Sequence, residues 1–545
     1  MLNTAKAFAL FLLFYVTAAY GQTPDVILVD GKIFTGNRAQ PYADALAISG
    51  SRITAVGSNP EIRRLAGRET RRIHLDGRTV VPGFNDAHTH FSVEPKAAKL
   101  EFRSMEPTWA EVSDALRAAV KKTPAGQWII GQVGGTAYLD RELNRASLDR
   151  ITRDHRVVIE TFYGHGTVVN TAAMKMLGIA ERPTDPLGGR YERDPVTGRF
   201  NGRANEYANW VLDRTLADFV TDADALTDLK RMGAEAAAFG VTTLQVMPMM
   251  RIERFVRLVE QADLPVRVRA IPFSLTTVRA RDMTEIRSLR SLKLRKRKLT
   301  VEGIKWIVDG TPFEHGAAMR SPYADRKAER GLMNFSSVQV EAMLRESLRL
   351  GEPILLHAVG DRTIETIFNA MEKIERQNAV DWKVRRVRIE HADALSGNLI
   401  GRAKRLGVVV VQNPTHFSFV EMFYARWSPQ MQFENQRTLI DAGIPYAIGS
   451  DGPMNPGLNI MFASAHPSRP SESISRPQAV EAYTSGSAFA EFAEREKGML
   501  KAGMLADLAV LSQDIFSVAP NALPATRSVL TIVDGRIVHN ANELK

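Results

Sequence analysis

The chain has 545 residues, of which 44% are hydrophobic and 24% charged, a composition typical of ordinary globular proteins. This composition excludes a disordered chain, and the length allows more than one hydrophobic core. The formal charge of +10 raises the question of a nucleic-acid or membrane partner. The densest basic run, 293–298, has no interleaved aromatic residues, so no nucleic-acid partner is predicted.

Residues 1–21 have the pattern of a secretory signal peptide. Lys6 precedes the apolar run Ala7–Val16, and small residues follow as far as Gly21. Such a run is too short for a bilayer span, which needs about 20 residues. We therefore expect cleavage near Gly21, no stable membrane span afterwards, and a secreted or periplasmic protein; an uncleaved anchor is the alternative. Because the chain has no cysteine, any metal must be held by nitrogen and oxygen.

Both ends of the chain predict short strands joined by tight turns. Asp-Gly pairs follow the apolar runs Val26–Val29, Ile73–Leu75 and Val529–Val533. Asp-Gly between apolar runs is a strong hairpin signal, because the turn needs positive φ. We therefore predict that residues 22–80 and 496–545 form one small β-sandwich domain, interrupted by the rest of the chain.

The middle of the chain, 81–495, alternates strand-like and helix-like segments about eight times. This α/β pattern predicts a parallel sheet, and the count favours a closed (β/α)₈ TIM-like barrel. A doubly wound open sheet is the alternative, although no G-x-G-x-x-G follows an early strand. Residues from about 99 to 235 do not fit the repeat and are predicted to be an insertion that covers part of the active site.

Polar residues stand at the ends of apolar strands, where barrel enzymes place their chemistry. His88 and His90 lie two positions apart on a strand-like stretch, so their imidazoles share one side. Further candidates come from later strands: Lys305, His357, His391 and Asp451. Each alone has an ordinary explanation, such as a hydrogen-bonded core histidine, a snorkelling lysine or a helix cap. Their joint occurrence on successive strands predicts a divalent-metal site.

Lys305 needs an explanation, because its ammonium would be repelled by a nearby dication. As a carbamate formed with carbon dioxide, it would offer two oxygens that can bridge two metals. We expect one or two metals per chain, with zinc first and manganese, iron or nickel as alternatives. A metal-bound hydroxide would attack a substrate carbonyl, and Asp451 would pass the proton to the leaving group.

Five motifs carry a resemblance to the amidohydrolase superfamily: VPGFNDAHTH (81–90), KWIVDG (305–310), LLHAVGD (355–361), RIEHAD (388–393) and IGSDGP (448–453). The resemblance covers nearly all of 25–545. Within the superfamily, GHGTVVNTAAM (164–174) and QNPTH (412–416) resemble the amidohydrolase 3 branch, which includes N-substituted formamide deformylases.

The resemblance implies metal-dependent hydrolysis of a C–N bond in a small amide-type substrate. It implies a metal shell of His88, His90, Lys305, His357, His391 and Asp451. It also implies that His165 and His416 face the substrate, where they would stabilise an oxyanion.

Several alternatives stay open at this point. Glu314 and His315, in a loop bulkier than the branch pattern, are either substrate-contacting groups or an ordinary loop pair. A metal-dependent esterase or lactonase would use the same attack. A non-catalytic periplasmic ligand-binding protein is a further alternative, although such a protein would not need the proton carrier Asp451. A homodimer is possible.

Overall fold

The computed structural model describes residues 23–278, 280–282, 294, 298–427 and 432–544. The predicted signal peptide, 1–21, and most of the basic run 293–298 lie outside these residues. Within the described part of the chain, no helix combines the length and apolarity that a membrane crossing requires.

Eight parallel strands form a barrel in the middle of the chain. Hydrogen bonding joins them in chain order. They are β8 (Phe84–Phe91), β15 (Val241–Pro248), β16 (Arg267–Ala270), a fourth strand in two pieces, β17 (Leu299–Val301) and β18 (Ile304–Ile307), then β19 (Ile354–Ala358), β20 (Arg388–His391), β21 (Val409–Gln412) and β22 (Tyr446–Ile448). The fourth strand breaks at Gly303, whose φ of +85° is favourable only for glycine.

Two backbone contacts close the barrel. The Lys305 amide donates to the Pro272 carbonyl at 3.0 Å and joins β16 to β18. The Asp451 amide donates to the His88 carbonyl at 2.8 Å, which joins the end of the last strand to the first. The predicted (β/α)₈ barrel is therefore confirmed, and the open doubly wound sheet is wrong.

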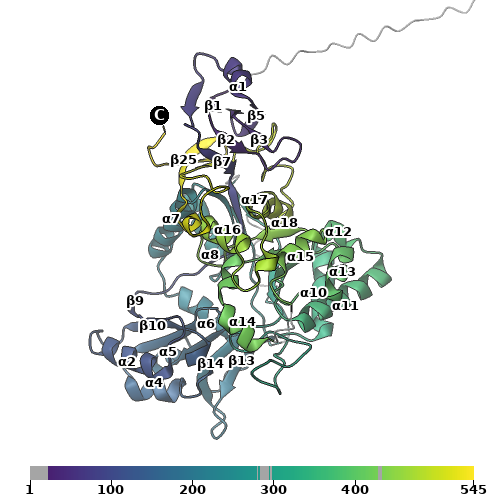
Figure 1. Cartoon of the computed structure of the whole chain (residues 1–545). Helices are drawn as coiled ribbons and strands as arrows, with labels where there is room; N and C mark the ends of the chain where they lie inside the picture. Colours follow the sequence, from purple (N-terminus) through teal and green to yellow (C-terminus); the bar gives the residue numbers. More distant parts are fainter. Residues whose placement is uncertain (1–22, 279, 283–293, 295–297, 428–431, 545) are drawn as a thin grey trace, which may run out of the picture.

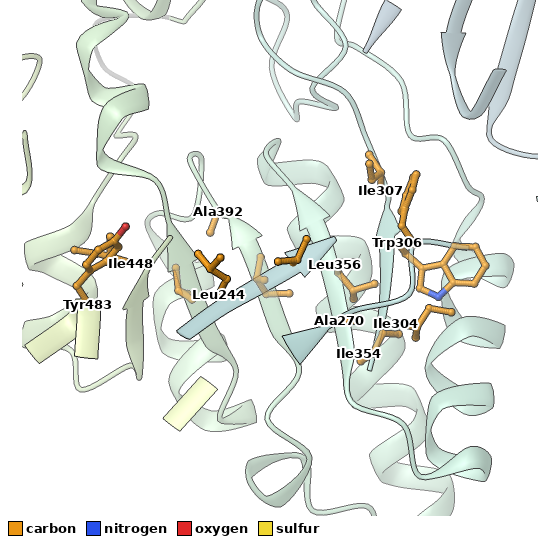
Figure 2. Packing of buried hydrophobic residues seen from close by; sticks show 14 of the residues in the cluster. Leu244, Ala270, Ile304, Trp306, Ile307, Ile354, Leu356, Ala392, Ile448 and Tyr483 are labelled. Carbon is orange, nitrogen blue, oxygen red and sulfur yellow. The ribbon is translucent and has the colours of Figure 1, made fainter. Parts of the chain in front are cut away.

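Alternate residues of the barrel strands point to opposite faces. One set, including Leu244, Ala270 and Leu356, is apolar and packs under the surrounding helices (Figure 2). These helices are α7 (Asp222–Ala238), α8 (Ile252–Ala262), α10 (Ser337–Leu350), α11 (Asp361–Asn378), α12 (Trp382–Arg385), α13 (Asn398–Leu406), α15 (Gln436–Asp441), α16 (Pro456–Ser464), α17 (Arg476–Glu481) and α18 (Ser487–Ala490). The alternate set contains hydrogen-bonded polar residues such as Gln245 and Arg388.

Between β8 and β15 the chain forms a separate six-stranded sheet. Its strands are β9 (Ala97–Leu100), β10 (Trp128–Val133), β11 (Arg156–Thr161), β12 (Gly166–Val169), β13 (Gly189–Arg193) and β14 (Phe200–Glu206), in the order β13-β14-β12-β11-β10-β9. Its helices are α2 (Trp109–Val120), α3 (Gly135–Leu139), α4 (Arg145–Ile151), α5 (Thr171–Met176) and α6 (Tyr207–Ala217). Figure 1 shows this unit at the lower left. We call it the inserted sheet unit.

Strands from both chain ends form two packed sheets, at the top of Figure 1. One sheet contains β5 (Arg52–Gly57), β4 (Ala45–Ser49), β1 (Val26–Val29) and β6 (Arg71–His74). The other contains β25 (Arg536–Asn540), β24 (Ser528–Val533), β23 (Leu508–Leu511), β7 (Thr79–Pro82), β2 (Lys32–Phe34) and β3 (Tyr42–Ala43). Apolar side chains of both sheets, such as Leu46 and Leu508, share one core. The predicted sandwich of the two ends is confirmed.

The Asp-Gly turns behave differently from the hairpin prediction. Only Asp534-Gly535 joins two paired antiparallel strands, β24 and β25. Asp30-Gly31 connects β1 to β2, and Asp76-Gly77 connects β6 to β7, and in both cases the two strands belong to different sheets. The hairpin prediction is therefore wrong for these two turns. Asp30 and Asp76 do have the positive φ that the sequence implies, so the local geometry is correct and the strand pairing is not.

Candidate metal centre

The structure brings all the predicted site residues to one cavity of about 640 Å³. His88 and His90 come from β8, Lys305 from β18, His357 from β19 and His391 from β20, and Asp451 follows β22. His165 and His416 line the same cavity. Seven of the eight residues come from barrel strands or from the segments directly after them, whereas His165 lies between β11 and β12 of the inserted sheet unit.

Asp451 is the centre of this arrangement. Its Oδ1 lies 3.3 Å from His90 Nε2 and 3.7 Å from His88 Nε2. Its Oδ2 lies 4.0 Å from His391 Nδ1. Donor atoms of His88, His391 and Asp451 all lie within 4.8 Å of one another, which is the spacing of a cluster able to hold a metal ion.

Lys305 and His357 lie beside this cluster. Lys305 Nζ is 3.5 Å from His88 Nε2, and burial lowers the pKa of the amine to about 8. The ring centroids of His357 and His391 are 4.4 Å apart. His357 Nε2 is buried without a hydrogen-bond partner among the described residues. A buried polar atom without a partner is costly, and a cation in the cavity would give this nitrogen a partner.

The protonation states of the histidines also suit a metal. Burial lowers the pKa of His88, His357 and His391 well below the usual value, and that of His90 to about 4. A histidine must be neutral to bind a metal. The residues present therefore fit a divalent metal held by nitrogen and oxygen.

Two of the candidate ligands have unusual backbone conformations. His391 has a φ of +69° and Asp451 a φ of +47°, in the left-handed region that non-glycine residues rarely adopt. Two hydrogen bonds hold the turn at Asp451 in place. The Asp451 amide donates to the His88 carbonyl, and the Ser450 amide donates to Asp86 Oδ1 at 2.8 Å. Such conformations cost on the order of 1–3 kcal/mol and cluster at functional sites.

Glu390 is a residue of the site that the sequence reasoning missed. Its Oε2 lies 2.6 Å from His88 Nδ1, and both side chains are fully buried. Arg388 donates to both oxygens of Glu390, at 2.8 and 3.1 Å. A carboxylate on one ring nitrogen fixes the histidine tautomer and leaves the other nitrogen for a metal. The available signal was the charged pair Arg388 and Glu390 in the fully buried strand that ends at His391.

Replacing Glu390 by glutamine should weaken metal binding by about 10–100-fold, the usual effect of losing such a supporting carboxylate. Competition with a chromogenic chelator measures this change. Glu329→Gln, at an exposed position, is the matched control. Equal metal affinity in Glu390→Gln and the control would show that Glu390 does not support the site.

His165 and His416 lie on either side of the cluster and differ in charge. His165 Nδ1 lies 3.1 Å from both oxygens of Glu206. Burial opposes the charge of His165, but the Glu206 carboxylate outweighs it and raises the pKa to about 9. His416 Nε2 is 3.7 Å from Asp451 Oδ2, and burial lowers the pKa of His416 to about 4. The site therefore has one charged and one neutral imidazole besides the cluster.

The loop after β18 answers one open question. Glu314 accepts the Thr311 amide at 2.5 Å and lies near His165 and Glu206, but it is absent from the residues that line the cavity. His315 pairs with Asp325 at 3.0 Å. These contacts stabilise the loop itself. The structure therefore favours the interpretation of Glu314 and His315 as an ordinary loop pair over direct contact with substrate.

Comparison with known proteins places this fold and site in a family. The model of the family described as "Amidohydrolase family" matches residues 71–539. The chain belongs to this family. This membership confirms the predicted class of enzyme, a metal-dependent hydrolase of carbon–nitrogen bonds other than peptide bonds.

This amidohydrolase is similar to "N-substituted formamide deformylase" of Arthrobacter pascens, with 27% identity over 94% of this chain and 98% of that protein. It is 24% identical to "Putative amidohydrolase YtcJ" of Bacillus subtilis (strain 168), over 93% and 98% of the two chains. Its fold is similar to that of an uncharacterized metal-dependent hydrolase from Pyrococcus horikoshii OT3, with a TM-score of 0.70, 19% identity and coverage of 91% and 99%.

Proposed function

We propose that this chain is an exported amidohydrolase that cleaves the C–N bond of a small amide. The observation that carries the proposal is the convergence of four imidazoles, one amine and one carboxylate from five barrel strands in a single cavity. Export is supported by the signal-peptide pattern of residues 1–21.

His88, His90, Lys305, His357, His391 and Asp451 would hold one or two divalent metals, with zinc first. Such a metal supplies a water nucleophile at neutral pH and polarises the substrate carbonyl. Lys305 would take part as a carbamate, which forms from a neutral amine. Burial lowers its pKa to about 8, so about a tenth of the amine is neutral at pH 7, far more than for an ordinary lysine.

The chain's own residues move the proton and bind the substrate. Asp451 lies at the centre of the site, where it would accept a proton from the attacking water and deliver it to the departing nitrogen. Burial raises the pKa of Asp451 to about 7, which suits a group that both accepts and donates protons near neutral pH. His165, charged through Glu206, would donate a hydrogen bond to the carbonyl oxygen as negative charge develops there.

Hydrolysis of a matched set of amides and esters tests the proposal. N-substituted formamides head the amide set because of the name of the Arthrobacter relative. Zinc-loaded full-length protein is expected to hydrolyse amides, and treatment with a chelator should abolish turnover. Hydrolysis of esters or lactones alone would indicate an esterase. Binding of amides without turnover by metal-loaded protein would indicate a ligand-binding protein.

A further inference from the structure

A network of buried polar side chains from β8, β15, β16 and β20 lies inside the barrel. Its members Asn85 and Arg388 precede the candidate ligands His88 and His391 in their strands, so the network lies on the amino-terminal side of the metal centre. Barrel interiors are normally filled by branched apolar side chains. A network that contains buried charges is weak evidence for stability, because the charged groups lose their hydration. Stability alone therefore does not account for it.

The network begins at His88. Glu390 Oε2 lies 2.6 Å from His88 Nδ1. Arg388 and Glu390 are two positions apart on β20, so their side chains share one face of the strand. Arg388 donates through Nε and Nη2 to the two oxygens of Glu390, and Nη2 also donates to the Ala87 carbonyl at 2.7 Å. The guanidinium of Arg388 therefore sets the orientation of the carboxylate that contacts His88.

Gln245, fully buried on β15, holds the other side of this guanidinium. Arg388 Nη1 donates to Gln245 Oε1 at 2.6 Å. Arg269, the neighbour of Gln245 across β15 and β16, donates to the same oxygen at 3.4 Å. The amide nitrogen of Gln245 donates to Asn85 Oδ1 at 3.1 Å and to the Ser487 carbonyl at 3.2 Å. These contacts allow one orientation of the carboxamide, since a flipped amide would turn its NH₂ group toward two guanidinium groups.

The far end of the network is fixed by an ion pair. Asn85 Nδ2 donates to Glu491 Oε1 at 2.6 Å, and Lys497 Nζ lies 2.7 Å from the same oxygen. Lys497 Nζ also donates to Thr243 Oγ1 at 3.1 Å, two positions before Gln245 on β15. Gln245 is therefore held from this side independently of Arg388, and it can act as a fixed support for the guanidinium.

Gln245 also lies between two cations. Arg269 is buried, and its Nε and Nη2 have no hydrogen-bond partner among the residues that the structure describes. Burial lowers the pKa of Arg269, and the charge of Arg388 acts in the same direction. Like charges repel at close range, so loss of the shared oxygen of Gln245 is expected to displace Arg388 from Glu390.

We propose that Gln245 is a positioning residue of the metal centre. By holding Arg388 against Glu390, it fixes the tautomer and the ring orientation of His88, whose Nε2 then faces Asp451 and Lys305. The proposal rests on the proposed function in one respect, because it takes His88 as a metal ligand.

Gln245→Met tests this role, because methionine keeps the length of the side chain and removes its hydrogen bonds. We expect zinc affinity, measured by competition with a chromogenic chelator, to fall by about tenfold, the lower end of the range for supporting residues. Gln245→Glu keeps oxygens that accept from both arginines, so it should stay within about threefold of the unmodified protein. A zinc affinity unchanged in folded Gln245→Met would overturn the proposal.

Gln436→Met is the matched control. Gln436 is also a fully buried glutamine, but it lies in α15, where its Nε2 donates to the Ala463 carbonyl. The control should keep its zinc affinity, and a loss equal to that of Gln245→Met would overturn the proposal. Gln245→Asn is the second variant, for the case in which Gln245→Met does not fold. It keeps the amide but is one methylene shorter, and a zinc affinity equal to that of the unmodified protein would likewise contradict the role of Gln245.

A double-mutant cycle separates positioning from a general effect on stability. If Gln245 acts through Glu390, then Gln245→Met should change zinc affinity by less than about twofold in a protein that already carries Glu390→Gln. A loss of about tenfold in both backgrounds would show that Gln245 does not act through Glu390.

Proton NMR of the metal-free full-length protein gives a measurement that requires neither metal nor substrate. The Nδ1 proton of His88, in its short hydrogen bond to Glu390, should give a downfield resonance, identified by its loss in Glu390→Gln. We expect this resonance to be weakened or lost in Gln245→Met and kept in Gln436→Met. An unaltered resonance in Gln245→Met would overturn the proposal. If the unmodified protein hydrolyses no amide, the proposed function fails, whereas the affinities and this resonance still test the role of Gln245.

Discussion

Asp451→Asn is expected to lower kcat by about 10²–10⁴-fold, the range for losing a group that transfers protons in the transition state. The carboxamide keeps the size of the side chain and one oxygen donor, but it can no longer accept a proton. Because the Asp451 amide, not its side chain, bonds to His88 and closes the barrel, folding should be preserved. Steady-state kinetics on metal-loaded protein measures the change, with the thermal unfolding midpoint as the check of folding.

Asp441→Asn is the matched control for this variant, because Asp441 is an exposed aspartate paired with Arg437 on the surface. It should retain full activity. A rate for Asp451→Asn within a few-fold of the unmodified enzyme would contradict the proton-transfer role, even if the metal site is intact.

Lys305→Ala is expected to remove most of the bound metal and, with it, most of the turnover. The reason is position: Nζ lies 3.5 Å from His88 Nε2 in a buried site, where an ammonium beside a dication would be repelled and a carbamate would bind it. Elemental analysis of protein purified without chelators gives the metal content. A short carboxylic acid in the buffer should restore part of both metal and activity, because it replaces the missing oxygens.

The rescue distinguishes a ligand from a structural lysine. Lys373→Ala, at an exposed lysine paired with Glu341, controls for loss of a positive charge and should keep its metal. Unchanged metal content in Lys305→Ala would exclude Lys305 as a ligand. Loss of metal without any rescue, in a protein that still unfolds cooperatively, would argue against the carbamate.

The barrel and the convergence of the site residues were predictable because both follow from the order of parallel strands along the chain. Parallel strands place their carboxyl ends at one mouth, so a polar residue at each strand end is enough to predict that the side chains meet. His357 is an example, since it follows the apolar residues Ile354, Leu355 and Leu356 in β19, and His391 is another, as the last residue of β20. No knowledge of side-chain contacts was needed to place them together.

The two glutamates that support histidines of the site were not predictable in the same way. Glu390 contacts His88 over a sequence separation of 302 residues. Glu206 reaches His165 from the end of β14, the antiparallel neighbour of β12. Neither glutamate belongs to a pattern with a fixed spacing. Asp30-Gly31 failed for a related reason: the dipeptide specifies a local backbone turn, whereas pairing depends on which distant strand buries the same apolar face.

The hydrogen bond between Asp451 and His88 has a consequence for the order in which the enzyme matures. The ribosome makes the first histidines early and the aspartate near the end, so a nascent chain holds only fragments of a chelating shell for most of its synthesis. The full set of candidate ligands therefore exists only after the segment that contains Asp451 has been made and joined to the first barrel strand. Metal content after purification should then be higher in complete chains than in truncated chains that lack Asp451.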